Sequence, residues 1–153
     1  MEWLKLDEPL SEREITQVED QLGLKLPEDY VKWIRQYEGP ESDFVSVDVN
    51  GEPHDVEGFY GPESLVDEMN LIFESREEYK GHGIIIPFAI DSILSKYCFF
   101  YPKGSQEPSG VFFRSRDVDL SDIFEGNDIK KSLYISQTFQ GFLDKLYIDE
   151  DWI

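Results

Sequence analysis

The chain has 153 residues and a formal net charge of −19, from 33 Asp and Glu against 14 Lys and Arg. This length suits one domain, and 40% hydrophobic and 14% aromatic residues indicate a folded globular chain. The acidic excess argues against binding to nucleic acid or an anionic membrane, because both need Lys and Arg at the phosphates. It is compatible with a basic protein partner, and equally with acidity that only keeps the protein soluble.

The acidic excess lies mainly in the first half of the chain. Residues 1–80 contain 22 acidic and 7 basic residues, whereas residues 81–153 contain 11 and 7. The single cysteine, Cys98, allows no intrachain disulfide, so nothing indicates an oxidising compartment. The N-terminus shows no signal-peptide pattern, and no apolar run is as long as a membrane span. We therefore expect a cytoplasmic protein.

Two helices are predicted near the N-terminus. The stretch 11–14, Ser-Glu-Arg-Glu, is a capping box, in which the first and last side chains bond each other's backbone. Ile15, Val18 and Leu22 then recur on one helical face. Gly23 is suited to end this helix, because glycine readily takes a positive φ there.

The second helix is predicted to begin with Pro27 in its first turn, followed by Glu28 and Asp29 at the positive end of the helix dipole. Gly39 is predicted to end it. An aromatic-rich stripe follows helical spacing: Tyr30, Trp33, Ile34 and Tyr37. The helix pair is not expected to bind DNA, because the few basic residues of the second helix are accompanied by more acidic residues.

Strands are predicted in the middle of the chain. Valines alternate with polar residues over 45–49, which predicts a half-buried strand ending at the turn Asn50-Gly51. Residues 54–64 are typical of a loop with a short strand at 58–60. Pro62 is predicted to open a third helix, with Leu65, Met69 and Ile72 on one face.

Three more strands, an acidic segment, a short last strand and a final helix complete the prediction. The strands cover 83–90, broken at Pro87, then 96–101 and 110–115. Residues 117–128 are an acidic loop or short helix, and 133–135 a last strand. Ser136 is predicted to cap a terminal helix with four apolar residues facing inward: Phe139, Phe142, Leu143 and Leu146. Strands in the middle and helices at the ends indicate an α+β fold.

The sequence contains few candidates for chemistry. His54 and His82 stand beside Gly or Pro without metal-ligand spacing, so exposed loop positions are expected. Cys98 in an aromatic strand is expected to be buried and inert. Asp117, Asp119 and Asp122 weakly resemble a calcium loop, but the glycine and glutamate that such a loop needs are missing, which favours a solvated acidic loop.

Several motifs, taken in order, resemble the SUKH superfamily. The N-terminal signature comprises Ile15, Glu19, Leu22, Gly23, Leu26, Pro27, Tyr30 and Gly39. The later stretches "IIIPFA", "GVFFRSRD" and "ISQTFQGFLDKL" are also similar to the family's pattern, and the resemblance covers residues 11–147. The chain departs from the pattern at residues 90–95, where the family often has glycines, and at 114–116.

The resemblance implies a single domain over residues 1–153, with a mostly antiparallel sheet flanked by the helix pair, a middle helix and a C-terminal helix. It implies an immunity protein that binds and neutralises a secreted toxin, often a nuclease, without catalysis or cofactor. The alternative is an intracellular regulatory or scaffold module of the kind that acts in cell-wall synthesis. An enzyme is the third option, and it would depend on an acid such as Asp55 or Asp117.

A nuclease needs a basic cleft, so an acidic chain complements it. The expected mechanism is one-to-one occlusion of the toxin's active site. As the binding face we predict the acidic segment, defined here as the stretch 38–57, with a merely solvated edge as the alternative. Its acidic residues are Glu38, Glu41, Asp43, Asp48, Glu52, Asp55 and Glu57.

Overall fold

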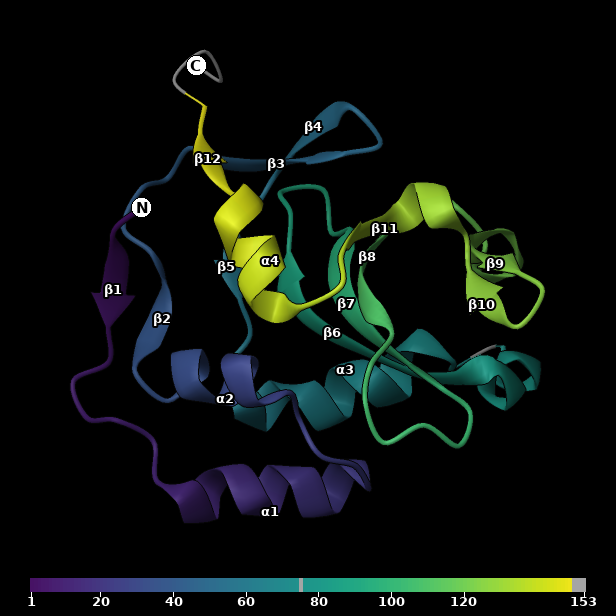
Figure 1. Ribbon diagram of the computed structural model, residues 1–153, viewed down its shortest axis with the longest axis horizontal. Coiled ribbons are helices and arrows are strands. Elements are labelled where there is room, and N and C mark those ends of the chain that lie inside the picture. The colour runs from purple at the N-terminus through teal and green to yellow at the C-terminus, as the bar shows by residue number, and fades with distance from the viewer. Residues whose placement is uncertain (75, 150–153) are drawn as a thin grey trace.

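A five-stranded sheet forms the centre of the protein, with the strand order β11-β8-β7-β6-β5 and every neighbouring pair antiparallel (Figure 1). The structure is a computed structural model that describes residues 1–74 and 76–149. The strands are β5 (Gly58–Phe59), β6 (Gly83–Ile90), β7 (Lys96–Pro102), β8 (Gly110–Arg114) and β11 (Tyr134–Ser136). The predicted α+β class and the mostly antiparallel sheet are confirmed.

Within residues 1–74 and 76–149, four α-helices lie around this sheet. They are α1 (Glu12–Leu22), α2 (Glu28–Ile34), α3 (Leu65–Ile72) and α4 (Phe139–Lys145). Helix α3 packs on β6, α1 packs on α3, and α2 packs on α4. Helix α1 therefore lies farthest from the sheet, at the bottom of the view in Figure 1. The 3₁₀ turns are η1 (Pro62–Ser64), η2 (Glu77–His82), η3 (Leu120–Ile123) and η4 (Lys131–Leu133).

The start and end of α1 confirm the prediction from local signals. The Ser11 hydroxyl accepts from the Glu14 N–H at 3.2 Å, and the Glu14 carboxylate accepts from the Ser11 N–H at 3.0 Å. Gly23 takes φ 75° at the C-terminal end. Pro27 lies one residue before α2 rather than in its first turn.

Helix α2 ends at Ile34, so the predicted end at Gly39 is wrong. Tyr37–Pro40 forms strand β2, which pairs antiparallel with β1 (Trp3–Lys5). The pairing comes from the far N-terminus, where Trp3 meets Trp33 edge to face with ring centroids 5.5 Å apart. This tertiary contact outweighs the helical spacing of Tyr37, because pairing with β1 satisfies the backbone of residues 37–40.

Strand β6 runs through Pro87 and is not broken there, contrary to the prediction. It pairs with β7 along its whole length, and the register shifts between Pro87 and Ala89. Such an irregularity accommodates a proline that cannot donate a hydrogen bond. The Phe88 carbonyl accepts from the Tyr60 N–H at 2.8 Å, which connects this point of β6 to the segment that follows β5.

A second sheet has the order β12-β3-β4, from strands β3 (Val45–Val49), β4 (Glu52–Asp55) and β12 (Tyr147–Ile148). The predicted turn is confirmed, because Asn50 and Gly51 both have positive φ, 50° and 82°, as a tight hairpin requires. Strand β4, which extends into the predicted loop, and strand β12 were not anticipated. Ser46 is buried rather than exposed, beside its register partners in β12 and β4.

The C-terminal third confirms a short helix, η3, within the acidic stretch 117–128. An unanticipated hairpin of β9 (Phe124–Glu125) and β10 (Asp128–Ile129) follows it. Ser136 does not cap α4, contrary to the prediction, because it belongs to β11. Thr138 is the cap, and its hydroxyl accepts from the Gly141 N–H at 3.0 Å.

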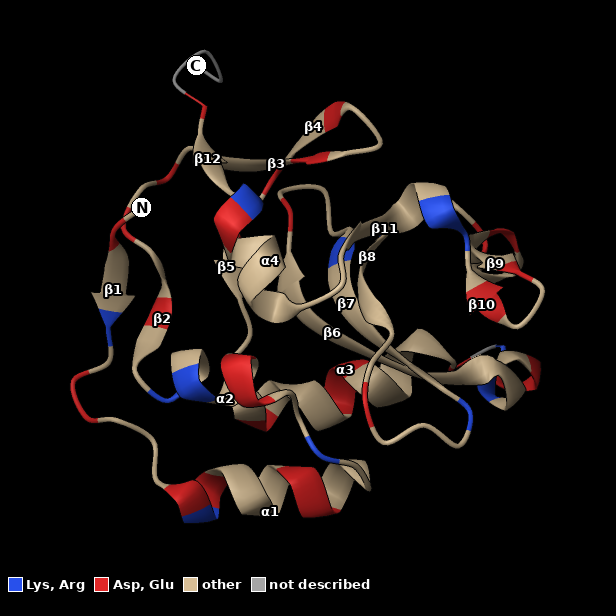
Figure 2. Ribbon diagram, viewed as in Figure 1, with Lys and Arg blue, Asp and Glu red and all other residues tan. Residues whose placement is uncertain are grey.

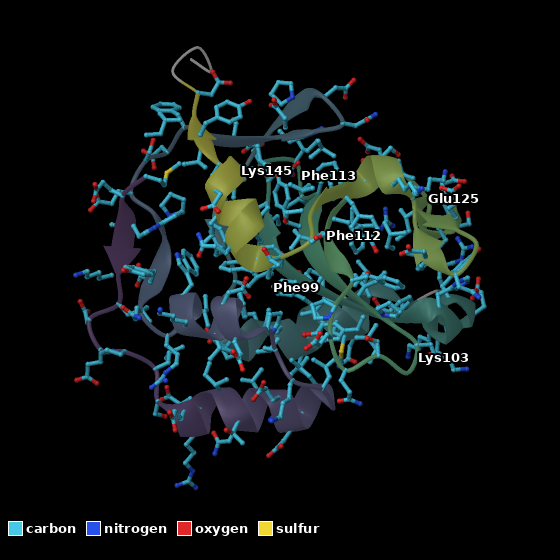
Figure 3. All side chains as sticks on the ribbon, in the orientation of Figure 1. Phe99, Lys103, Phe112, Phe113, Glu125 and Lys145 are labelled. Carbon is cyan, nitrogen blue, oxygen red and sulfur yellow. The ribbon has the colours of Figure 1, made fainter. Side chains whose placement is uncertain are left out.

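The central sheet is covered on both faces. The face toward the helices carries Phe88, Phe99 and Val111 and belongs to the main core, together with Tyr30 and Phe139. The opposite face forms a second cluster, which includes Ile85, Cys98, Phe100, Phe112, Leu120, Ile123 and Ile129. Figure 3 shows Phe99 and Phe112 among the side chains that fill the interior. Burial on both faces explains why β6, β7 and β8 are almost continuously apolar.

Candidate protein-binding surface

The acidic segment runs from β2, over the connection to β3, and along the β3–β4 hairpin to the start of β5. Glu38 lies on β2, Asp48 on β3, and Glu52 and Asp55 on β4. Six of its seven acids are exposed, and Asp55 is half-buried. Figure 2 shows red segments and no blue along this path. The backbone of this segment thus places its carboxylates at the surface.

The register of the hairpin divides these carboxylates between two faces. Asp48 is paired with Pro53, and Ser46 with Asp55, so Asp48 and Asp55 share one face. Glu52 is paired with Val49 and lies on the other face. The structure therefore does not gather all of the predicted residues into one cluster, and the hairpin is acidic on both sides.

Two of the carboxylates are held by hydrogen bonds from other elements. Asp48 accepts from the Tyr147 hydroxyl at 2.6 Å, which joins β3 to β12 and raises the pKa of Tyr147 to about 12. Asp55 accepts from the Ser92 N–H at 3.1 Å and from the Ser92 hydroxyl at 3.0 Å. The Asp55 carbonyl accepts from the Tyr97 hydroxyl at 2.6 Å. These bonds fix the orientation of both acids at the surface.

Basic side chains do not neutralise the acidic segment. Residues 36–75 contain 11 acids and neither Lys nor Arg. In the part of the chain that the structure describes, none of the seven predicted acids lies in an ion pair. The absence of bases over forty positions is the sequence signal that marks this surface most clearly. Unpaired charges of one sign produce a field that reaches about 8–10 Å into physiological salt.

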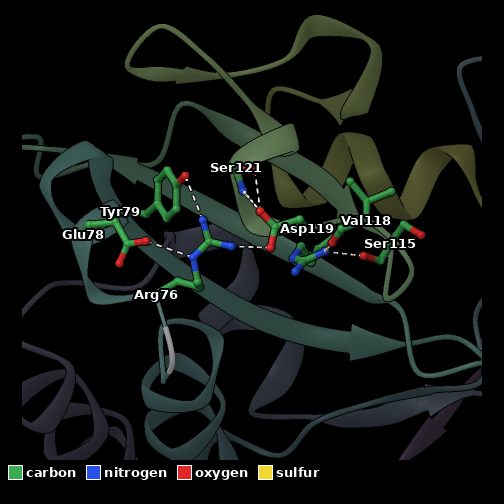
Figure 4. A network of polar contacts seen from close by, with 8 residues as sticks. Arg76, Glu78, Tyr79, Ser115, Val118, Asp119 and Ser121 are labelled. Atoms are coloured by element: carbon green, nitrogen blue, oxygen red, sulfur yellow. Dashed lines mark hydrogen bonds and ion pairs between the residues drawn. The ribbon is translucent and has the colours of Figure 1, made fainter.

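Asp119, within the stretch 117–122, has a structural role. Asp119 caps η3 by accepting from the Ser121 N–H at 3.2 Å, and it also binds the Ser121 hydroxyl and Arg76 (Figure 4). These contacts hold the pKa of Asp119 well below its usual range, with the Ser121 hydroxyl as the main cause. Among residues 1–74 and 76–149, no group of three or more His, Cys, Asp or Glu side chains is arranged to hold a metal ion.

Both histidines differ from the exposed loop positions that we predicted. His54 lies on β4, half-buried, with its ring 4.3 Å from that of Phe113. His82 ends η2, half-buried, and stacks on Phe124 at 4.3 Å. Both ring partners come from segments far along the chain, so local sequence did not reveal them. Cys98 is fully buried as predicted, and burial raises the pKa of its thiol.

These features describe an α+β domain whose surface is distinguished by charge rather than by a reactive cluster among its described residues. The model of the SMI1 / KNR4 family (SUKH-1) matches residues 9–145, and the chain belongs to this family. Comparison with curated proteins found no match, and comparison with solved structures found none.

Members of this family are generally immunity or regulatory proteins rather than enzymes. Membership is therefore consistent with an immunity-type protein that binds another protein. No helix within residues 1–74 and 76–149 is long and apolar enough to cross a membrane.

Proposed function

We propose that the protein is a cytoplasmic immunity protein that binds a cognate secreted toxin one to one and blocks its basic active site. A nuclease is the toxin class that fits best. The observation that carries this proposal is an acidic segment on a member of the SUKH-1 family, whose acids form no ion pair within the described part of the chain. The exposed acids of the hairpin and of the connection before it supply the binding face.

The physical argument is complementarity of charge. A nuclease must present Lys and Arg, or a bound cation, where phosphates bind. Acidic side chains on an inhibitor occupy the same field, so they attract the toxin from a distance and compete with its substrate. Steering of this kind speeds association strongly at low salt and weakens as salt screens the charges.

Co-expression tests this proposal. The chain is expressed together with each C-terminal toxin domain of the secreted proteins encoded in the same genome, and growth is measured. We expect the chain to restore growth against one toxin domain and to form a one-to-one complex with it in analytical ultracentrifugation. We also expect the association rate constant to fall steeply between low and physiological salt.

A regulatory module gives a different result. It restores growth against no toxin domain, and in affinity capture it retains several intracellular proteins with weaker, less salt-dependent binding. That outcome would replace the immunity proposal with the scaffold alternative. A toxin neutralised by the chain at sub-stoichiometric ratios would instead favour an enzymatic mechanism.

A further inference from the structure

The turn between β6 and β7, residues 91–95, exposes two large apolar side chains. Ile93 and Leu94 are each 55% exposed. We propose that this turn is the apolar anchor of the binding face, inserted into a recess beside the cationic active site of the toxin. The proposal rests on the proposed function and names a second part of the same surface.

The backbone of the turn is held rigidly from within. The Asp91 side chain accepts from the Ile93 N–H at 3.0 Å and from the Ser95 N–H at 2.8 Å. The Asp91 N–H donates to the Ser95 carbonyl at 3.0 Å, and Asp91 itself is buried. A turn closed by three such bonds presents its tip in one conformation. Binding through it therefore loses little conformational entropy.

Two neighbouring segments hold the turn from outside. Ser92 donates twice to Asp55 of the acidic segment, and the Ser95 hydroxyl accepts from the Arg116 N–H at 3.0 Å. The apolar tip is thus attached directly to the acidic hairpin on one side. In Figure 1 the loop between β6 and β7 lies below the β3–β4 hairpin.

Leu94 is an unusual residue for its conformation. Its φ is 73°, in the left-handed region that leucine avoids and glycine adopts freely. Asn50 is the only other non-glycine residue with positive φ in the part of the chain described, and asparagine tolerates that region. An exposed leucine recovers little stability by packing, so folding alone does not account for it.

The charges around the turn select the partner. Asp55 lies against Ser92, and the Glu57 N–H donates to the Ile90 carbonyl at 2.9 Å, which places two acids at the base of the turn. Neither is in an ion pair among the described residues. The opposite flank has one basic and one acidic residue in sequence, Arg116 and Asp117. An apolar tip with an acidic base fits an apolar recess with a basic rim.

The test compares two leucines of equal exposure. Leu94→Asn removes one of the two apolar side chains of the tip but keeps a residue that tolerates positive φ. Leu71→Asn makes the same change on α3, where Leu71 is 56% exposed. The probe is the toxin domain against which the wild-type chain restores growth. We expect L94N to raise the Kd about tenfold or more, at low and at high salt alike, and L71N to change it less than twofold.

Each result has a defined meaning. Leu94→Gly is the folding control, because it relieves the backbone conformation, and we expect it to unfold at or above the wild-type temperature while losing affinity as L94N does. Wild-type affinity in L94N and L94G, or an equal loss in L71N, would overturn the anchor and leave the immunity proposal standing. Failure of the wild-type chain to neutralise any toxin domain would overturn both.

Discussion

Glu19 and Leu26 are joined across the turn between α1 and α2, where the Leu26 N–H donates to the Glu19 carboxylate at 2.7 Å. The Glu19 carbonyl accepts from the Gly23 N–H at 2.9 Å, so one residue satisfies the backbone donors of both the glycine and Leu26. This relationship explains what Glu19 does in the N-terminal signature. These bonds hold the chain between the two helices.

Glu19→Ala is expected to destabilise the protein. Leu26 is buried, so its N–H would lose its partner at a cost of about 1–3 kcal/mol in the free energy of unfolding. Glu19→Gln retains a carbonyl acceptor and should cost less. Urea denaturation of the two variants measures the difference, and equal losses would show that the side-chain oxygen is not what matters.

Substitutions at Tyr30 distinguish the contribution of ring packing to stability from that of hydrogen bonding. Its ring is fully buried, with centroids 5.0 Å from Phe139 and 5.3 Å from Phe99, and its hydroxyl has no hydrogen-bond partner among the described residues. Tyr30→Ala should cost about 3–5 kcal/mol. Tyr30→Phe should be neutral or stabilising, because it removes an unsatisfied polar atom. A large loss of thermal stability in Y30F would contradict this.

Asp119 provides a prediction about pH. Its contacts with Ser121 and Arg76 hold its folded-state pKa below the unfolded value of about 3.9. These contacts therefore stabilise the folded protein fully at pH values above the unfolded pKa. This contribution to stability is lost as the pH falls through the folded-state pKa. In Ser121→Ala and Arg76→Ala, the carboxyl pKa from an NMR titration should rise toward the ordinary value. The reverse direction, or no change in either variant, would contradict the assigned cause.

Charge reversal tests the acidic segment as the binding face. Asp48→Lys and Glu52→Lys, made separately because they lie on opposite faces of the hairpin, should each slow association with the neutralised toxin at low salt. Asp20→Lys on α1 makes the same change in net charge far from the hairpin and serves as the control (Figure 1). If all three variants slow association equally, only net charge matters and the segment has no special role.

Elements with local signals could be predicted from the sequence. Three such signals each lie within a few residues and predict the local structure: the capping box of residues 11–14, the glycine at 23 and the Asn50-Gly51 turn. The alternating valines of β3 and the apolar runs of β6, β7 and β8 did so through their pattern. These signals fix the α+β class and the order of the main elements.

Elements that depend on distant partners could not be predicted. Strands β1 and β12 have three and two residues and exist only because β2 and β3 offer them backbone groups to pair with. For the same reason the local sequence did not predict the contact between the His54 and Phe113 rings. At the candidate surface, composition identified the acidic hairpin. The positive φ of Leu94 could be recognised only in the structure, because nothing in the local sequence indicates it.

The second cluster beneath the sheet has a consequence for measuring motion. Cys98 is the single thiol of the chain and is fully buried in that cluster, on the face turned away from the helices. A thiol reagent can reach it only when this layer opens, so the rate of labelling at low denaturant reports local opening of one side of the sheet. Comparison with global unfolding would show whether the two faces of the sheet open together or separately.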